Sequence, residues 1–323
     1  MARQLSAAMI RTLFLIAAFA FAGLASACGT PAAQAPEEAK PVSTLRAVDE
    51  ADAVRVAVLA IRSAVAANAQ YGPIVAHLEE SLGRPFVLVP VGQEEQFEVV
   101  REAQVEFTFN NPLSAVQLGR LYGTEFLATL SRRNTGPEFG GVIIARADSG
   151  IETASDLRGK NVTCVAFETA AAGCNFQIFH LLEQGVSTED FTSFTETPSQ
   201  DNIVLGVLNG SVDAGFVRTG QIERMLEEGT LLSLDELRIV DQAESDFHFP
   251  HSTRLYPEWP FAALAGADPE LAEAARRALL ALEPDHPAMV NAGAEGFVPA
   301  ADYQPIDDLI VALKLRSWDA PSD

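Results

Sequence analysis

The sequence predicts an α/β protein of two lobes, with parallel-rich sheets flanked by helices and a two-strand hinge. First, strand-like and helix-like segments alternate from Val54 onward. Second, the strand-like runs are apolar throughout, which is typical of parallel strands covered on both faces. Third, two further strand-like segments, 140–147 and Leu255–Ala265, stand before and after an inner α/β set. A lobe inserted into another needs one outward and one returning crossing, and these segments stand where such crossings belong.

The elements follow in order along the chain. A helix is predicted from Tyr71, with Pro73 in its first turn and Gly83 as its stop. Other helices are predicted at 93–104, 153–160, 174–185, 200–210 and 220–229. Strands are predicted at 54–60, 85–91, 105–112, 124–130, 139–146, 161–167 and 211–217. We therefore expect lobe one to comprise 52–139 plus 256–323, and lobe two to comprise 140–255.

The N-terminus has the pattern of a secretory signal. Arg3 and Arg11 precede an uncharged run, Thr12–Ala25, and small residues follow up to Cys28. This end resembles the lipobox of bacterial lipoproteins, which implies a signal peptide over 1–27 and a lipid on the Cys28 sulfur. An ordinary signal peptide that happens to carry a cysteine is the alternative. Residues 28–51 are rich in proline and lack apolar periodicity, so they predict a flexible tether.

The composition limits the partners. The formal net charge is −22, and removal of residues 1–27, with two arginines and no acid, makes it −24. Such a surface repels nucleic acid and anionic lipid. No later segment approaches about 18 consecutive apolar residues. We expect a periplasmic monomer, anchored to a membrane by its N-terminal lipid and otherwise soluble.

Several segments together resemble a known family. They are "YGPIVAHLEESLG", "VEFTFNNP", "LATL", "GGVIIARADSGI", "DLRGK", "VLNGSVDAGFVRTG" and "STRLYPEWPFAAL". Their order is similar to the phosphate/phosphite/phosphonate substrate-binding family, a branch of the type II periplasmic binding proteins, over about Val54 to Leu315. The resemblance is greatest to the branch that includes extracytoplasmic sensor regions of histidine kinases. It implies a cleft for a small, usually anionic solute and a membrane partner, either an ABC importer or a sensor kinase.

The sequence departs from this family at one point. Phosphonate-binding members carry a turn rich in serine and threonine at the start of a lobe-two helix. The matching stretch here, "ETAAAGCNF", has Thr169 as its single hydroxyl. Free N–H groups at a helix N-terminus can still bind an anion. We therefore expect a small oxyanion that is phosphate-, phosphite- or phosphonate-like or a related arsenic or sulfur oxyanion, with a classical alkylphosphonate as the less favoured ligand.

Candidate ligand-binding residues follow strand ends, where open α/β sheets bind ligands. Arg218 and Thr219 follow one strand, and an arginine offers a planar fork of donors to an oxyanion; pairing of Arg218 with a nearby glutamate is the alternative. Asn110 and Asn111 end another strand and can contact the ligand or cap the next helix. The remaining candidates are Arg62, Ser63, Tyr71, Thr169, Cys174 and Asp201.

Cys164 and Cys174 pose a separate question. An oxidising compartment and an even number of remaining cysteines favour a disulfide. An ideal strand and helix would hold their Cα atoms farther apart than the limit of about 7 Å for such a bond. A free Cys174 at a helix N-terminus would instead be a reactive thiol facing the ligand. Both possibilities remain open from the sequence.

Motifs of enzymes are absent from the sequence. It has no Gly-x-Ser-x-Gly, His-Glu-x-x-His or P-loop pattern. His248 and His251 have no recognisable partners for a metal site, so we expect neither a metal nor a cofactor. The sequence predicts a solute-binding protein that closes on a small oxyanion. The alternative is a lipoprotein enzyme or a structural, adhesive lipoprotein on the same fold.

Overall fold

The computed structural model describes residues 52–320. The predicted signal peptide, Cys28 and the tether 28–51 lie outside the described residues. Within 52–320, no helix is both long and apolar enough to cross a membrane.

Lobe one is built on a six-stranded sheet with the order β13-β4-β12-β3-β1-β2. Its parallel half consists of β1 (Val54–Leu59), β2 (Phe86–Val91) and β3 (Phe107–Phe109). The other half, β4 (Glu125–Arg132), β12 (Pro260–Ala263) and β13 (Ala294–Pro299), joins by antiparallel pairing. The sheet is therefore mixed, because strands that follow the return from lobe two complete it.

Helices cover both faces of this sheet. On one face, α1 (Ala64–Leu82) packs against α7 (Pro269–Leu280) and α8 (Pro287–Ala292). This packing buries the main core, which includes Phe107, Phe109 and Trp259. The other face carries α2 (Glu95–Arg101) and α3 (Pro112–Tyr122), and α9 (Gln304–Leu313) packs against α3.

Lobe two is built on a five-stranded sheet with the order β10-β6-β9-β7-β8. The strands β7 (Asn161–Cys164), β8 (Ser193–Glu196) and β9 (Ala214–Arg218) are parallel. The strands β6 (Gly141–Arg146) and β10 (Leu237–Val240) complete the sheet by antiparallel pairing. The helix α4 (Phe176–Glu183) lies over one apolar core, and α5 (Gln200–Leu208) and α6 (Gln221–Glu227) lie over a second.

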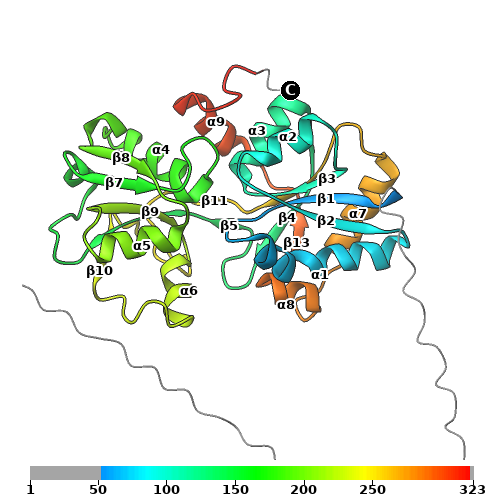
Figure 1. Cartoon of the computed structure of the whole chain (residues 1–323), viewed down its shortest axis with the longest axis horizontal. Coiled ribbons are helices and arrows are strands. Elements are labelled where there is room, and N and C mark those ends of the chain that lie inside the picture. Colours follow the sequence, from blue (N-terminus) through cyan, green and yellow to red (C-terminus); the bar gives the residue numbers. More distant parts are fainter. Residues whose placement is uncertain (1–51, 321–323) are drawn as a thin grey trace, which may run out of the picture. The chain divides into compact units, whose positions relative to one another are not determined.

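Two short strands join the lobes. β5 (Glu138–Phe139) and β11 (Tyr256–Pro257) pair antiparallel between the two larger sheets (Figure 1). The predicted two-lobed α/β fold with a two-strand hinge is thus confirmed. Two details differ from our expectation. The helix predicted from Tyr71 begins at Ala64, because Ser63 caps it there, so Pro73 lies inside the helix and not in its first turn. In addition, most of 140–147 is the inner strand β6 of lobe two, and the outward crossing is β5, just before it. Paired residues of β6 and β9 leave this segment no freedom to act as the connection.

Candidate functional site

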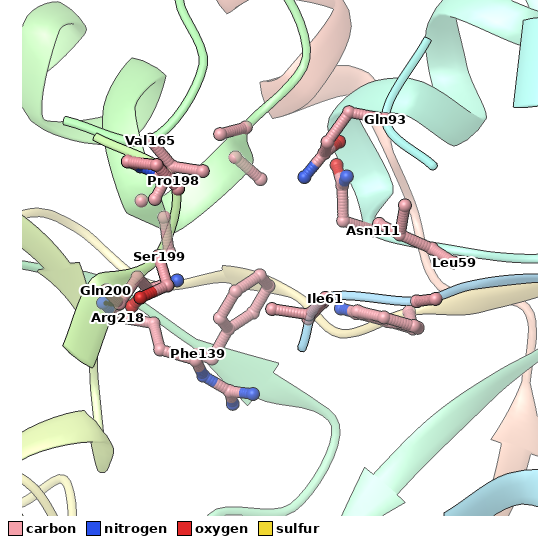
Figure 2. Close-up of a pocket in the computed structure, with 16 residues that line it drawn as sticks. Leu59, Ile61, Gln93, Asn111, Phe139, Val165, Pro198, Ser199, Gln200 and Arg218 are labelled. Carbon is pink, nitrogen blue, oxygen red and sulfur yellow. Dashed lines mark hydrogen bonds between the residues drawn. The ribbon is translucent and has the colours of Figure 1, made fainter. Parts of the chain in front are cut away.

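A pocket lies between the two lobes at the carboxyl ends of parallel strands. Lobe one contributes residues that end or follow β1, β2 and β3, and lobe two contributes residues that end or follow β7, β8 and β9. Figure 2 shows Leu59, Gln93 and Asn111 on one side of this cleft pocket and Val165, Pro198 and Ser199 on the other. The full lining consists of Leu59, Ala60, Ile61, Gln93, Asn111, Phe139, Val165, Ala170, Ala171, Ala172, Gly173, Pro198, Ser199, Gln200, Arg218 and Trp259.

Arg218 is the one charged residue that lines the cleft pocket. It ends β9, and its guanidinium group lies 5.2 Å from the centre of the Phe139 ring in the hinge. Its Nη2 atom donates to Glu258 Oε1 at 3.1 Å, whereas its Nε atom is buried and has no acceptor within residues 52–320. Burial lowers the pKa of Arg218, and the neighbouring charge of Arg132 lowers it further. An anion that accepted from Arg218 would relieve both effects.

Three helix N-termini meet in the same pocket. Asn111 caps α3, Ala171–Gly173 form the turn that runs into α4, and Ser199 caps α5. The backbone N–H groups of Ala171, Ala172 and Gly173 have no acceptor among the described residues. Free amides and helix dipoles of this kind attract negative charge. The pocket is therefore locally suited to an anion in a protein of strongly negative net charge.

The walls of the cleft pocket are largely apolar. Leu59, Ile61, Phe139, Val165 and Trp259 line it together with the alanines of the turn. The polar side chains on the wall are neutral apart from Arg218, and they come from Gln93, Asn111, Ser199 and Gln200. This arrangement suits a ligand with a charged group and a less polar body, because apolar walls leave oxygen atoms without partners.

A disulfide holds the turn at the pocket wall. Cys164 and Cys174 are bonded, both are fully buried, and their Cα atoms lie 5.0 Å apart. The turn folds back on the strand, with Val165 N donating to Gly173 O. This return brings the cysteines closer than an ideal strand and helix would allow. Cys174 consequently has no free thiol, and it does not line the pocket.

The two candidate asparagines have internal partners. The Nδ2 atom of Asn111 donates across the cleft to Thr169 O at 3.1 Å, and its Oδ1 atom accepts from Ser114 N. Asn110 donates to Gln96, and its Oδ1 atom is buried without a donor within residues 52–320. Thr169 is also buried and does not line the pocket. Of these three, the structure places only Asn111 at the pocket wall.

Arg62 and Asp201 lie in an ion network between the lobes. Arg62 of lobe one contacts Asp201 and Glu228 of lobe two, and Arg224 contacts the same two carboxylates. We call these four residues the interlobe network. Arg62 and Asp201 line an adjoining pocket that shares Arg218 with the cleft pocket, so their charges are already paired next to the candidate site.

The other candidates lie around this centre. Ser63 caps α1 by accepting from Ala66 N. Tyr71 is buried, lines the adjoining pocket and contacts the rings of Phe109 and Trp259. The Thr219 hydroxyl accepts from Gly140 N, which ties the end of β9 to the hinge.

Sequence reasoning missed Glu258 and Arg132. Glu258 is fully buried beside the hinge, and its Oε1 atom accepts from both Arg132 and Arg218. A glutamate inside the apolar run "LYPEWPFAALA" was the available signal, because a buried carboxylate requires a partner. Residues 52–320 contain no group of His, Cys, Asp and Glu side chains that would hold a metal ion.

Fold and pocket together define a two-lobed solute-binding protein. The chain belongs to the family described as the periplasmic substrate-binding protein of phosphonate ABC transporters, whose model matches residues 56–304. The description of this family as periplasmic substrate-binding proteins agrees with our expectation of an extracytoplasmic solute-binding protein.

Known proteins resemble the chain at two levels. It is 31% identical over 231 residues to the tetrathionate sensor histidine kinase TtrS of Salmonella typhimurium, covering 69% of this chain and 38% of that relative's length. The structure of PhnD1 from Prochlorococcus marinus in complex with methylphosphonate has a TM-score of 0.68 at 15% identity, covering 81% of this chain and 98% of that one. A phosphonate-transporter binding protein from Pseudomonas aeruginosa has a TM-score of 0.68 at 14% identity, covering 81% and 87%. These two structures show the same fold.

Proposed function

We propose that this protein binds a small oxyanion in the cleft pocket and closes its two lobes around it. The carrying observation is that Arg218 and three helix N-termini face one pocket whose walls come from both lobes. Electrostatic complementarity of this kind favours an anion over a neutral solute. Motion about β5 and β11 would couple binding to a change that a membrane partner can recognise.

Within this class, we propose a sulfur oxyanion of the tetrathionate type as the first ligand to test. The likeness to a tetrathionate sensor kinase supports it, as do the apolar walls between the polar groups of the pocket. The turn without hydroxyl side chains argues against a simple alkylphosphonate. Phosphate, phosphite and arsenic oxyanions remain alternatives within the same class.

The partner in the membrane is part of the proposal. A binding protein of this fold hands its ligand to an ABC importer or presents it to a sensor histidine kinase. The family model supports the first and the similar kinase supports the second. We further propose that cleavage before Cys28 and lipidation of its sulfur anchor the protein at a membrane. Mass spectrometry of the mature N-terminus would detect the diacylglyceryl group, and an unmodified Cys28 would contradict the anchor.

A thermal-shift screen tests the ligand. The protein from residue 52 onward would be heated with phosphate, phosphite, methylphosphonate, arsenate, sulfite, thiosulfate or tetrathionate, because a ligand that binds only the native state raises Tm. Tetrathionate is expected to raise Tm most, and calorimetry should then give a stoichiometry of one. A null result with every oxyanion, in protein of verified fold, would reject the proposed function. Turnover of the anion without stoichiometric binding would favour an enzyme instead.

A further inference from the structure

One carboxylate oxygen joins the two lobes beside the hinge. Glu258 follows β11, and its Oε1 atom accepts from Arg132 Nε at 2.7 Å and from Arg218 Nη2 at 3.1 Å. Arg132 ends β4 in lobe one and Arg218 ends β9 in lobe two. We call Arg132, Glu258 and Arg218 the hinge cluster. Since its members come from both lobes, the cluster can be complete only in one relative position of the lobes.

The hinge cluster has one positive charge too many. Two guanidinium groups share one carboxylate, and the exposed side-chain fractions are 11% for Arg132, 22% for Arg218 and 0% for Glu258. Arg132 Nη2 and Arg218 Nε are buried and have no acceptor within residues 52–320. Burying a charge without a partner is unfavourable. The arrangement is therefore incomplete without one further negative group.

Within residues 52–320, no second carboxylate forms an ion pair with Arg132 or Arg218. The Glu258 Oε2 atom accepts from Trp259 N, and Arg132 lies against the ring of Trp259 at 6.0 Å. The Tyr71 side chain also faces both arginines. Glu223 and Glu227 line a neighbouring pocket with Arg132 and Arg218, but they form no ion pair with either arginine. Asp201 and Glu228 are paired with Arg62 and Arg224.

We propose that the hinge cluster makes closure of the cleft depend on an anion, with Glu258 as the positioning residue that leaves one guanidinium charge for the ligand. This proposal rests on the proposed function. Without an anion, closing the lobes brings Arg218 up to Arg132 and dehydrates a net charge of one. A bound anion offsets that charge through Arg218, which lines the cleft pocket. A neutral solute of the same shape leaves the closed state unfavourable, so the cluster selects ligands by charge.

Changing the charge of the cluster tests this inference. Arg132→Gln leaves one guanidinium and one carboxylate, so it should let the lobes close without any ligand. Arg132→Lys keeps the charge and should stay open like the wild type. Arg158→Gln is the matched control, because it removes an arginine from a surface ion pair with Asp190 in lobe two. Small-angle scattering in chloride-free buffer would report the compactness of each protein before and after addition of sodium tetrathionate.

A fluorescence readout can follow the same change locally. The chain has two tryptophans, and Trp318→Phe leaves Trp259, which lines the pocket and contacts Arg132, as the single reporter. In this background, Arg132→Gln should show the ligand-bound emission of the parent before tetrathionate is added. It should also bind tetrathionate at least about tenfold more weakly, since Glu258 then neutralises Arg218 and leaves no guanidinium charge for the anion. Arg132→Lys should keep affinity within about threefold, because the charge is retained.

The outcomes separate the two proposals. Ligand-free Arg132→Gln that is as extended as the wild type, with a normal melting transition, would overturn the hinge-cluster inference. If Arg132→Gln fails to fold, Arg132→Met gives the same charge with an apolar stem and the same expected compaction. Wild-type protein that never compacts with any oxyanion contradicts the proposed function, while compaction of ligand-free Arg132→Gln still supports the charge imbalance.

Discussion

The Nη2 atom of Arg62 in lobe one lies 2.9 Å from the Oδ2 atom of Asp201 in lobe two. The same Nη2 atom lies 3.0 Å from Glu228 Oε2. These contacts span the cleft, so they exist only while the lobes are close together. All four side chains of the interlobe network are partly exposed, so each ion pair contributes only modestly to the stability of the closed state.

Arg62→Gln should therefore speed ligand release more than it slows ligand capture. We expect the dissociation rate of tetrathionate to rise about threefold, which corresponds to an exposed ion pair. Stopped-flow fluorescence at low and high salt would measure it, and added salt should reduce the difference between the two proteins because the network is screened. Equal release rates at low salt would contradict a role of Arg62 in holding the lobes together.

The same network predicts a dependence on pH. Burial by itself would raise the pKa of Asp201, but hydrogen bonds from Arg62 and Gln221 and the charge of Arg224 bring it below its usual value. The hydrogen bond from Arg62 likewise lowers the pKa of Glu228. A carboxylate with a lowered pKa stabilises the closed state above its ordinary pKa and loses that effect as the pH falls through the lowered value. Release should thus accelerate below about pH 4 in the wild type, whereas Arg62→Gln should show a smaller acceleration.

Arg218→Gln should remove most of the affinity for an oxyanion. Its side chain is the charged group of the cleft pocket, and charge-assisted hydrogen bonds in a partly dehydrated site contribute about 1.5–3 kcal/mol. We expect tetrathionate binding to weaken by roughly 10- to 100-fold in calorimetry. Arg158→Gln should bind as the wild type does. Retention of full affinity by a folded Arg218→Gln protein would remove the central residue of the proposed site.

Reduction of the Cys164–Cys174 bond should weaken both stability and binding. The bond closes a short loop, with a sequence separation of 10, for which about 2–3 kcal/mol of stabilisation is expected. The free energy of unfolding of the double variant Cys164→Ser/Cys174→Ser, measured in urea, should be lower than that of the wild type by this amount. Its affinity for tetrathionate should also fall, because the amides of Ala171–Gly173 lose their fixed position. Unchanged affinity in the double variant would show that the bond stabilises the fold without positioning the site.

Gly215 is expected to tolerate no side chain. It lies in β9, three residues before Arg218, and a Cβ atom there would stand 2.3 Å from Cγ2 of Ile203 on α5. Gly215→Ala should destabilise the protein by about 1–3 kcal/mol through overpacking. Gly72→Ala is the control, since a Cβ at this position in α1 meets nothing within 4 Å, and it should be neutral or stabilising. Urea unfolding of both variants checks the pair.

Much of the candidate site could be predicted because it depends on local patterns. Arg218 directly follows an apolar strand, and Asn111 precedes Pro112 at a helix start. Both were therefore expected at the carboxyl ends of strands, where ligands bind. Arg62 was expected there because it follows the first strand, and Asp201 was a candidate because it stands at the head of a helix, but their mutual ion pair was not expected. The sequence separation of Arg62 and Asp201 is 139 residues, and no periodicity relates positions so far apart.

The sequence by itself determined the alternation of strands and helices, the strand ends and the loop with Thr169 as its single hydroxyl. It could do so because these signals are local: apolar periodicity indicates which residues are buried, and capping residues indicate where helices begin and end. Only the tertiary structure decided that Glu258 lies between Arg132 and Arg218, which are 126 and 40 residues from it. That contact depends on how two separately folded sheets meet at β5 and β11, and the free energy of a buried charge depends on its neighbours in space.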